Sequence, residues 1–347
     1  MMQKEQLGRT GMNVSVYCLG TMTFGNETDE ADAHRQLDLA WERGINFLDA
    51  AEMYPVNPVA FETAGLTEEI VGRWLASRKP ADAILATKIT GAGSAAVQDG
   101  AAISGARLRT VVEASLKRMQ SDCIDIFQLH WPNRGSYHFR KGWGFDPSHQ
   151  NRVETVAHMT EVLQMAQTLI DEGKIRHFAL SNETAWGTAT WVRLAEEAGL
   201  PRVASIQNEY SMLCRMFDLD LAELSVNEDI PLLAYSALGA GLLTGKYAGN
   251  VTPENTRRAR SPELGGRITP RVFEAVSGYL AIANETGLDP VHMAYQWTRT
   301  RPFQCIPIVG ARNTAQLEHL LNGVDVTLDP QVRAAIDKVH RAIPLPF

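Results

Sequence analysis

Three things are scarce in this chain of 347 residues: cysteine, basic charge and long apolar runs. The cysteines show no Cys-x-x-Cys spacing, so we expect reduced thiols, not disulfides or a metal site, at Cys18, Cys123, Cys214 and Cys305. No apolar run reaches the roughly 18 residues of a membrane helix, and the first residues lack the apolar segment of a secretory signal. We therefore expect a cytoplasmic protein.

The balance of charge narrows the range of partners. Acidic residues outnumber basic ones 40 to 33, which gives a net charge of −7. Nucleic acids and anionic membranes attract basic surfaces, so we expect neither as a partner and expect a small-molecule ligand instead. The sequence leaves the oligomeric state open.

Short apolar runs alternate with longer segments of helical period, which predicts strands and helices in turn. The expected strands are residues 15–20, 45–49, 83–88, 124–129, 176–180, 203–207, 231–235 and 305–309. The expected helices are residues 29–43, 67–77, 109–120, 153–172, 186–199, 218–228, 270–286, 289–300 and 314–322. Gly44 and Gly173 stand where two of these helices should end, and Thr67 stands where one should begin.

Eight strand–helix units in one chain favour a single (β/α)8 TIM barrel over residues 1–347. An open dinucleotide-binding sheet fits less well, because residues 19–25 after the first strand contain no Gly-x-Gly-x-x-Gly motif. Residues 7–11 predict the turn of an N-terminal β-hairpin that plugs the bottom of the barrel. The long connections after strands 4 and 7, residues 131–152 and 236–269, are expected to be functional loops.

Four polar residues stand at or just beyond the ends of three successive strands: Asp49, Tyr54, Lys88 and His130. In a parallel barrel these ends share one face, which is the usual place of an active site. We expect the ammonium of Lys88 to lower the pKa of the Tyr54 phenol, while Asp49 holds Lys88 in position. His130 could orient a substrate carbonyl by a hydrogen bond. Such a set suits protonation of an oxygen that is becoming an alkoxide.

The second half of the chain offers a place for a reductant, which these four residues do not supply. Ser181 and Asn182 end strand 5 and can hydrogen-bond an amide, and Tyr235 ends strand 7 with an aromatic face. A glycine-rich loop with Lys246 follows, and Arg312 precedes a helix whose N-terminal N–H groups favour an anion. Singly each could be a helix cap, a core tyrosine or a solvated arginine. Together they describe a site for an amide, a ring and a phosphate.

Segments along the whole chain resemble the aldo-keto reductase superfamily, and most of all its Tas-like branch. They extend over about residues 5–340 and include Leu-Gly-Thr-Met-Thr-Phe-Gly (19–25), Gly-Ile-Asn-Phe-Leu-Asp-Ala-Ala-Glu-Met-Tyr (44–54), Ala-Thr-Lys (86–88), Gln-Leu-His-Trp-Pro (128–132), Leu-Ser-Asn-Glu (180–183), Ile-Gln-Asn-Glu-Tyr-Ser (206–211), Leu-Leu-Thr-Gly-Lys-Tyr (242–247) and Val-Gly-Ala-Arg (309–312). The resemblance implies a TIM barrel that binds NADP(H) across its C-terminal face and reduces aldehydes or ketones by hydride transfer.

The resemblance also implies roles for single residues. Asp49, Tyr54, Lys88 and His130 would be the catalytic tetrad, with Tyr54 as the proton donor. Cofactor contacts would come from Thr21, Met22, Asp49, Ser181, Asn182, Gln207, Tyr235, Ser236, Leu238, Gly241, Lys246, Arg260, Gly310, Arg312, Gln316 and His319. The substrate pocket would be formed by Met22, Tyr54 and Trp131. Arg312 favours NADP over NAD, because a guanidinium suits the 2′-phosphate.

Two departures from the family pattern bear on the expected cofactor site. Leu320 stands where the family usually has an adenine-contacting Asn, and the nearest Asn lies two residues further along. In the loop after strand 7, Arg257, Arg258 and Arg260 compete for one cofactor-binding role, for which Arg260 is the expected residue.

Two other functions stay open. One is an NADP(H)-sensing binding module with little turnover, like the potassium-channel β subunits of this superfamily. Those proteins carry Asn where His130 stands, so this residue favours the enzyme. The other is a different barrel enzyme, such as an isomerase that uses Lys88 and His130 and has no need of Arg312.

Overall fold

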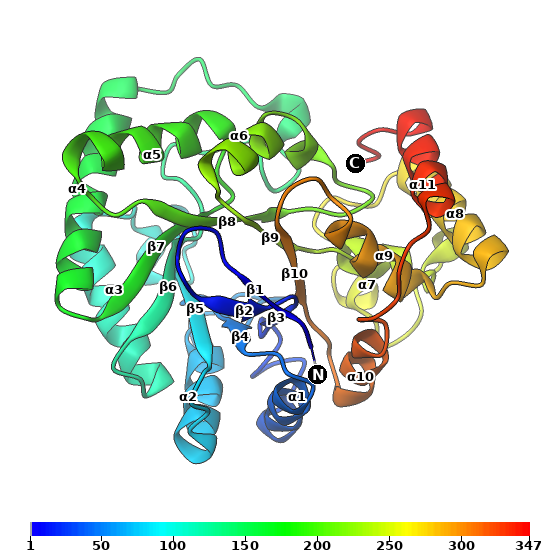
Figure 1. Ribbon diagram of the computed structural model, residues 1–347, viewed down its shortest axis with the longest axis horizontal. Coiled ribbons are helices and arrows are strands. Elements are labelled where there is room, and N and C mark those ends of the chain that lie inside the picture. The colour runs from blue at the N-terminus through cyan, green and yellow to red at the C-terminus, as the bar shows by residue number, and fades with distance from the viewer. Residues whose placement is uncertain (1) are drawn as a thin grey trace.

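The computed structural model describes residues 2–347, and a closed barrel lies at its centre (Figure 1). Within this range, eight parallel strands close the barrel in the order β10-β3-β4-β5-β6-β7-β8-β9. They are β3 (Cys18–Gly20), β4 (Phe47–Asp49), β5 (Ile84–Ile89), β6 (Ile124–Leu129), β7 (Ile175–Ser181), β8 (Val203–Glu209), β9 (Leu232–Tyr235) and β10 (Cys305–Val309). The predicted TIM barrel is confirmed.

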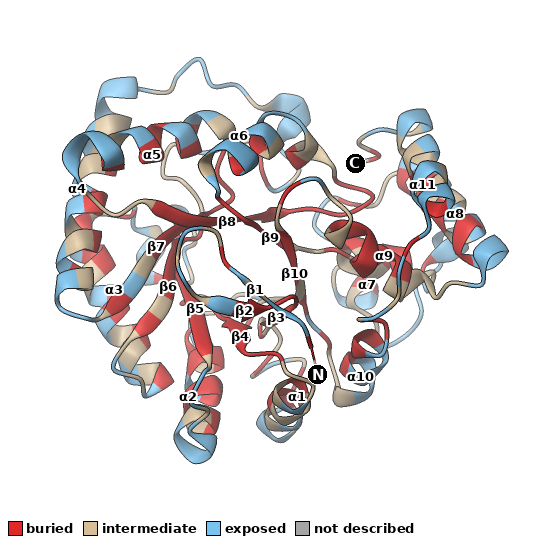
Figure 2. Cartoon of the chain, in the orientation of Figure 1, coloured by how far each residue is buried: buried red, intermediate tan, exposed pale blue. Residues whose placement is uncertain are grey.

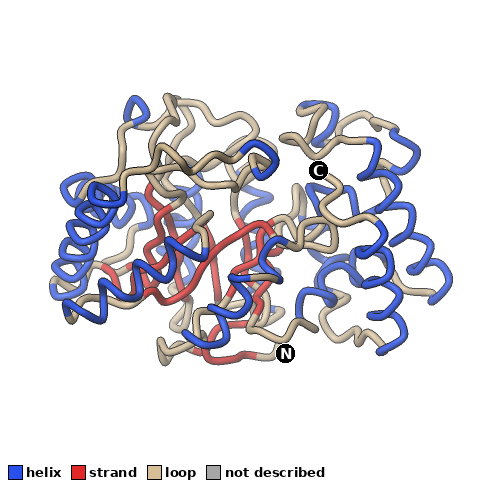
Figure 3. The backbone as a smooth tube through the Cα atoms, turned by 90° about the horizontal axis from the view of Figure 1, so that it is seen from above, coloured by secondary structure: helices blue, strands red, loops and turns tan. Residues whose placement is uncertain are grey.

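Helices surround the strands and bury their apolar faces against the barrel, while their outer faces are exposed (Figures 2 and 3). They are α1 (Glu30–Glu42), α2 (Leu66–Arg78), α3 (Gly105–Met119), α4 (Arg152–Asp171), α5 (Ala185–Ala198), α6 (Asp220–Glu228), α7 (Arg257–Arg260), α8 (Pro270–Thr286), α9 (Pro290–Arg299), α10 (Thr314–Leu321) and α11 (Pro330–Ala342). The last of these packs on α8 at one side of the barrel. No helix within residues 2–347 is long and apolar enough to cross a membrane.

An antiparallel hairpin of β1 (Lys4–Gln6) and β2 (Asn13–Ser15) closes the N-terminal end of the barrel, as predicted. Leu7 is fully buried and packs into the cluster of small apolar side chains that fills the barrel. Gly8 has φ +44°, and a Cβ there would lie 2.6 Å from the carbonyl oxygen of Asp229. The turn therefore requires glycine at this position.

The alternation of side chains along three strands stacks a polar layer on an apolar one. The inward-facing positions of β4 to β6 run from Phe47 to Asp49, from Ala86 to Lys88 and from Ile126 to Gln128. The lower member of each pair packs inside the barrel, and the upper member is polar and buried. The strand register pairs Lys88 with Gln128 and Asp49 with Ala86, so the three polar side chains lie near one another at the C-terminal end of the barrel.

Both long connections that we predicted are present, as residues 130–151 between β6 and α4 and residues 236–269 between β9 and α8. Each contains short 3-10 turns, which are Gly142–Gly144 in the first and Gly239–Thr244 and Ala248–Asn250 in the second. Further turns of this kind are Gln98–Gly100 and Met216–Asp218. Both connections leave from the C-terminal ends of their strands and lie beside the polar layer.

Several details of the secondary structure differ from the expectations. The strand expected at residues 15–20 is the end of β2 and the whole of β3, with a break between them. Thr67 does not cap α2: the cap position is Gly65, at φ +89°, and the Thr67 hydroxyl donates to the carbonyl oxygen of Phe24 at 2.7 Å. Gly44 and Gly173 do end their helices, with φ of +89° and +73°.

Candidate active site

Asp49 and Lys88 form a buried ion pair at the C-terminal end of the barrel. The Lys88 ammonium donates to Asp49 Oδ2 and to the carbonyl oxygen of Ala50, both at 2.7 Å. Burial acts to lower the pKa of Lys88, but Asp49 and Tyr54 together outweigh it and the pKa is raised. Lys88 is therefore charged at neutral pH, and the pair is the electrostatic centre of the site.

Tyr54 lies in the loop after β4 and points its hydroxyl at Lys88. The oxygen is 3.4 Å from the ammonium, and the ammonium lies 4.8 Å from the ring centroid. Burial raises the pKa of the phenol, and this effect exceeds the lowering by Lys88. The net direction is opposite to the one we expected from the sequence, so the phenol stays protonated at neutral pH. The hydroxyl holds a proton beside a fixed positive charge.

His130 follows β6 and lies edge-on to Tyr54. The two ring centroids are 5.8 Å apart at an interplanar angle of 73°. Burial and the nearby Lys88 hold the pKa of His130 well below its ordinary value, so the ring is neutral at neutral pH. Its Nδ1 is buried and has no hydrogen-bond partner among residues 2–347. The ring therefore has unused hydrogen-bonding capacity next to the phenol.

Two glutamine amides hold the other oxygen of Asp49. Gln207 and Gln128 donate to Oδ1 at 2.9 and 3.2 Å, and Gln207 also donates to the Gln128 side-chain oxygen at 3.2 Å. We had assigned Gln207 to a cofactor amide and had not singled out Gln128. The signal for Gln128 is its place as the one polar residue in the run Ile126–Leu129. The amides fix the carboxylate that fixes Lys88.

Ser181, Asn182 and Tyr235 come together beside His130. The Tyr235 hydroxyl donates to Asn182 Oδ1 at 2.7 Å. The Asn182 amide donates to the carbonyl oxygen of His130 at 2.9 Å and to Ser181 Oγ at 3.1 Å. Asn182 has φ +52°, which Asn tolerates better than most residues. The side chains expected at a cofactor amide thus lie together, but most of their hydrogen bonds are already made within the chain.

The first loop of the barrel closes another side of the site. Thr21 is buried and donates its hydroxyl to the carbonyl oxygen of Asp49 at 2.8 Å. Met22 is half-buried, and its carbonyl oxygen accepts from the Val56 N–H at 3.0 Å, which ties this loop to the loop of Tyr54. Thr21 and Met22 therefore lie next to Asp49 and the Tyr54 loop, and their cofactor contacts stay a prediction.

Trp131 extends the wall beyond His130, with the two rings 5.1 Å apart. Its indole N–H donates to the carbonyl oxygen of Ala92 at 3.0 Å. A Cβ at Gly91 would come within 2.2 Å of this nitrogen, so the indole can lie here only because residue 91 is glycine. Phe139 meets the other side of Trp131, with ring centroids 5.8 Å apart.

A cavity of about 230 Å³ opens behind Phe139, between the 130–151 loop and the C-terminal segment. Its walls are mostly apolar and include Tyr137, Phe139, Trp143, Met216, Leu345 and Phe347. Phe139 and Arg140 both have positive φ, of +59° and +63°, a rare arrangement for two successive non-glycine residues. The Arg140 guanidinium holds this backbone in place by donating to the Glu209 carboxylate at 2.8 Å.

The loop after β9 carries three cations without an acidic partner, and two of them, Lys246 and Arg257, also make no hydrogen bond through their charged nitrogens in the described part of the chain. Among residues 2–347, no carboxylate lies within 4.0 Å of the charged nitrogens of Lys246 or Arg257. A Cβ at Gly241 would meet Lys246 Cε at 2.9 Å, and φ there is +95°, so the loop needs glycine to pass the lysine. Leu238 is partly buried against the core and Ser236 has φ +57°. The bend of this loop leaves both cations free for an anion.

The three neighbouring arginines of this loop have different surroundings. Arg260 donates to Glu27 at 2.6 Å, and Arg258 donates to the carbonyl oxygen of Val251 at 2.8 Å. Burial and the nearby Arg267 lower the pKa of Arg257, whose Nε is buried without a partner in the described part of the chain. Arg260 stays the predicted cofactor-binding residue, but Arg257 is the arginine of the three whose Nε has no hydrogen-bond partner in the described residues.

The start of α10 places Arg312 and Gln316 together. The backbone N–H of Arg312 donates to the Gln316 side-chain oxygen at 3.1 Å, and its guanidinium donates to the carbonyl oxygen of Asn255 in the loop after β9. Gly310 is exposed at the end of β10. His319, in contrast, faces α9, where its Nε2 lies 3.1 Å from Asp289. The structure groups two of the expected residues and pairs His319 elsewhere.

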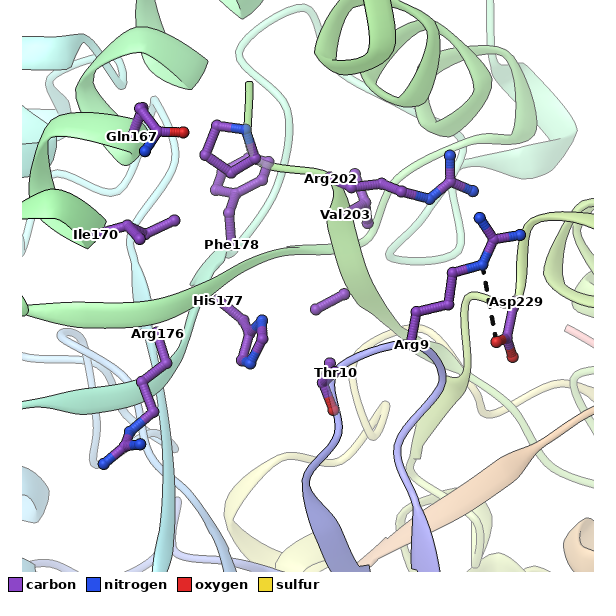
Figure 4. Close-up of a pocket in the computed structure, with 12 residues that line it drawn as sticks. Arg9, Thr10, Gln167, Ile170, Arg176, His177, Phe178, Arg202, Val203 and Asp229 are labelled. Carbon is purple, nitrogen blue, oxygen red and sulfur yellow. Dashed lines mark ion pairs between the residues drawn. The ribbon is translucent and has the colours of Figure 1, made fainter. Parts of the chain in front are cut away.

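A second cavity, of about 280 Å³, lies at the opposite end of the barrel beside the hairpin turn (Figure 4). Arg9 and Asp229 face each other at its edge at 3.8 Å. Arg176 pairs with Asp125 at 2.9 Å, so the charges around this cavity are largely balanced. It has no connection with the polar layer and holds none of the residues that we expected in the site.

Comparisons with known proteins agree with this geometry. A profile of the Aldo/keto reductase family matches residues 17–341. The chain is 39% identical over 355 residues to "Protein tas" of Escherichia coli (strain K12), covering 99% of each protein. It is 28% identical to "Uncharacterized oxidoreductase YrpG" of Bacillus subtilis (strain 168), covering 97% of this chain and 96% of that protein. It is 29% identical to "Probable voltage-gated potassium channel subunit beta" of Arabidopsis thaliana, covering 99% and 98%.

Proposed function

The chain belongs to the aldo/keto reductase family, and on this premise we propose that it reduces aldehydes or ketones to alcohols with NADPH. The family and its oxidoreductase relatives identify it as an oxidoreductase. The observation that carries the finer proposal is the protonated Tyr54 hydroxyl 3.4 Å from the buried ammonium of Lys88. This arrangement suits protonation of a carbonyl oxygen at the moment it gains negative charge.

Tyr54 is the proposed proton donor. NADPH, when bound, supplies a hydride for the carbonyl carbon, and the phenol proton passes to the carbonyl oxygen. Lys88 then stabilises the phenolate that is left, and Asp49 keeps the ammonium charged and in place. Because burial raises the pKa of Tyr54 above its ordinary value of 10.0, the proton is available throughout the neutral range. Reduction should slow only when the pH rises above that value.

His130 is proposed to orient the substrate. A neutral imidazole can donate one hydrogen bond to a carbonyl oxygen without delivering its proton, and its low pKa keeps it neutral. The edge-on contact with Tyr54 lets both groups reach the same oxygen. His130 and Tyr54 would then hold the carbonyl from two sides.

The fit to a nicotinamide dinucleotide is best at its phosphate end. Lys246 and Arg257 supply positive charge without a partner in the described residues, which suits a pyrophosphate. Arg312 and Gln316 at the start of α10 would receive the adenosine end, and the arginine favours a 2′-phosphate. At the other end Asn182 Oδ1 and Ser181 Oγ each keep a lone pair for the carboxamide, and Tyr235 would lie against the ring.

We propose that the substrate is an apolar, often aromatic, carbonyl compound. Trp131 and Phe139 line the way from His130 to the apolar cavity of about 230 Å³, which is large enough for a ring.

All four cysteines are unpaired thiols, which supports a reducing compartment such as the cytoplasm.

The test follows NADPH absorbance with purified protein and a panel of carbonyl compounds. We expect 4-nitrobenzaldehyde to be reduced with NADPH and to be reduced at least tenfold less efficiently with NADH. Aliphatic aldehydes of three carbons should be poorer substrates, because they leave the cavity unfilled. Tight NADPH binding without turnover over the whole panel would contradict the enzyme and favour a cofactor-sensing module, the alternative that the potassium-channel relative suggests. Absence of both binding and turnover would contradict the cofactor assignment itself.

A further inference from the structure

We propose that Asp289, His292 and His319 form a binding site for a divalent transition-metal ion, with Zn²⁺ as the best fit. The site lies between α9 and α10, on the outer side of the barrel, and does not depend on the proposed reductase function. One ligand atom from each residue lies within 4.8 Å of the other two. The carboxylate Oδ2 and His319 Nε2 are already 3.1 Å apart. Ligand atoms about 2.0–2.2 Å from a zinc ion lie roughly 3–3.5 Å from one another, so small side-chain rotations complete the site.

The carboxylate is held in position by the backbone. Asp289 caps α9, and its Oδ1 accepts from the N–H groups of Val291 and His292 at 2.8 and 3.1 Å. Because these bonds occupy Oδ1, the other oxygen remains for a ligand bond. The cap therefore serves as the outer support that a metal ligand normally has.

One nitrogen of His292 has a hydrogen-bond partner in the backbone. Its Nε2 lies 2.7 Å from the carbonyl oxygen of His319 and can only donate to it, so Nδ1 is the nitrogen left to bind a metal. Metal-binding histidines usually donate their second nitrogen to a carbonyl or carboxylate in this way. The same contact places the two imidazoles face to face, with centroids 4.9 Å apart and planes inclined by 29°.

Gly323 makes room for the His292 ring. A Cβ at this position would lie 2.3 Å from two ring carbons, so any side chain would displace the imidazole. The backbone of Gly323, the Asp289 cap of α9 and the carbonyl oxygen of His319 therefore position the ring together.

Two imidazoles and one carboxylate are the donor set of zinc and of similar borderline ions. Magnesium and calcium prefer sites made of oxygen atoms only, so they fit less well. Three protein ligands leave a fourth position for water, and the exposure of His319 allows the ion to enter from solution. A hydrogen bond between Asp289 and His319 without a metal would also explain the 3.1 Å contact, and binding measurements distinguish the two explanations.

The experiment titrates chelator-treated full-length protein with ZnCl₂ by calorimetry and with CoCl₂ by visible absorption. We expect one Zn²⁺ per chain and the absorption of tetrahedral Co²⁺. Asp289→Asn keeps the helix cap, because Asn caps as well as Asp, and removes the anionic ligand. We expect this variant and His292→Ala to bind Zn²⁺ at least tenfold more weakly.

The control is His149→Ala, which removes an exposed histidine from the 130–151 loop. It should leave zinc affinity within twofold of the starting protein. Melting temperatures without metal establish that the variants are folded, and Zn²⁺ should raise the melting temperature of the unaltered protein but not that of Asp289→Asn. No saturable Zn²⁺ binding, or binding that the two ligand variants leave unchanged, would overturn the proposal.

Discussion

The charged side chains on the two sides of the C-terminal face differ in whether an opposite charge lies beside them. On the β4–β6 side, Lys88 has Asp49 at 2.7 Å, and that carboxylate has two glutamine amides on its other oxygen. On the side of β9 and α10, Lys246 and Arg257 have no acidic partner within residues 2–347. The first side has its charges paired without a ligand, which suits the proposed acid–base role, and we propose that an anion pairs the charges of the second.

The largest expected effect comes from Lys88→Met. It should lower kcat/KM by about 10²- to 10³-fold, because the phenolate loses its stabilising charge. It should also lower the free energy of unfolding by about 3–5 kcal/mol, because Asp49 is left buried without its cation. Steady-state kinetics and urea denaturation measure the two losses.

A matched surface variant and a double variant sharpen this result. Lys174→Met breaks exposed ion pairs with Glu113 and Glu172 and should change the stability little, because water screens both pairs. Adding Asp49→Asn to Lys88→Met should restore much of the stability, because no buried charge is left, but none of the turnover. Recovery of turnover in the double variant would show that the ion pair is structural and not catalytic.

Arg257→Met tests the other side of the face. It should weaken NADPH binding about 10- to 100-fold, because a phosphate contact is lost, as measured by fluorescence titration. Its stability without ligand should be equal or higher, since an unpaired half-buried charge is removed. Arg260→Met, which breaks the surface pair with Glu27, is the control and should change affinity less than threefold. If Arg260→Met weakened NADPH binding more than Arg257→Met, Arg260 would be the cofactor-binding arginine, as the sequence suggested.

Arg312→Ala tests the preference for the phosphorylated cofactor. NADPH affinity should fall about tenfold, while NADH affinity should change less than threefold, because NADH lacks the 2′-phosphate that the guanidinium would bind. Equilibrium titrations with both dinucleotides measure the ratio. An equal loss for the two would assign Arg312 to loop packing through its bond with Asn255.

The smallest expected effect is a pH dependence of stability from His130. Its pKa in the folded protein lies well below the ordinary value of 6.5, because burial and Lys88 disfavour the charged ring. The unfolded chain binds this proton near pH 6.5, so stability falls as the pH drops below that value, by at most about 1.4 kcal/mol per pH unit for one group. His130→Asn should flatten the curve between pH 7 and 5. An unchanged slope would mean that the ring is not held neutral.

The barrel and the buried pair of Asp49 and Lys88 were predictable from the sequence, because both follow from strand alternation. Asp49 ends β4 and Lys88 is the last inward-facing residue of β5, two residues beyond the Ala86 that pairs with Asp49, so the long lysine side chain can reach the carboxylate. Gln128 has the same kind of position and could have been found by the same argument. The helix α11 was missed, although Val332, Ile336 and Val339 repeat at helical spacing.

Other features depend on contacts that the sequence does not encode locally. The net shift of the Tyr54 pKa is the difference between burial and the charge of Lys88, and its sign needs the folded environment. Which of Arg257 and Arg260 faces inward is set by the path of a loop with several left-handed residues. Thr67 has a good capping sequence, yet a contact with Phe24 from another loop places it inside the helix.

The most direct test of the account is the Tyr54→Phe variant, with turnover and NADPH affinity measured on the same preparation. We predict that kcat falls by at least 100-fold while the dissociation constant for NADPH changes less than threefold, because the proton donor is lost and the anion-binding side is intact. Tyr279→Phe, which removes another buried hydroxyl far from Lys88, should keep full turnover. Turnover of Tyr54→Phe within a few-fold of the unaltered protein would contradict the central role of the phenol.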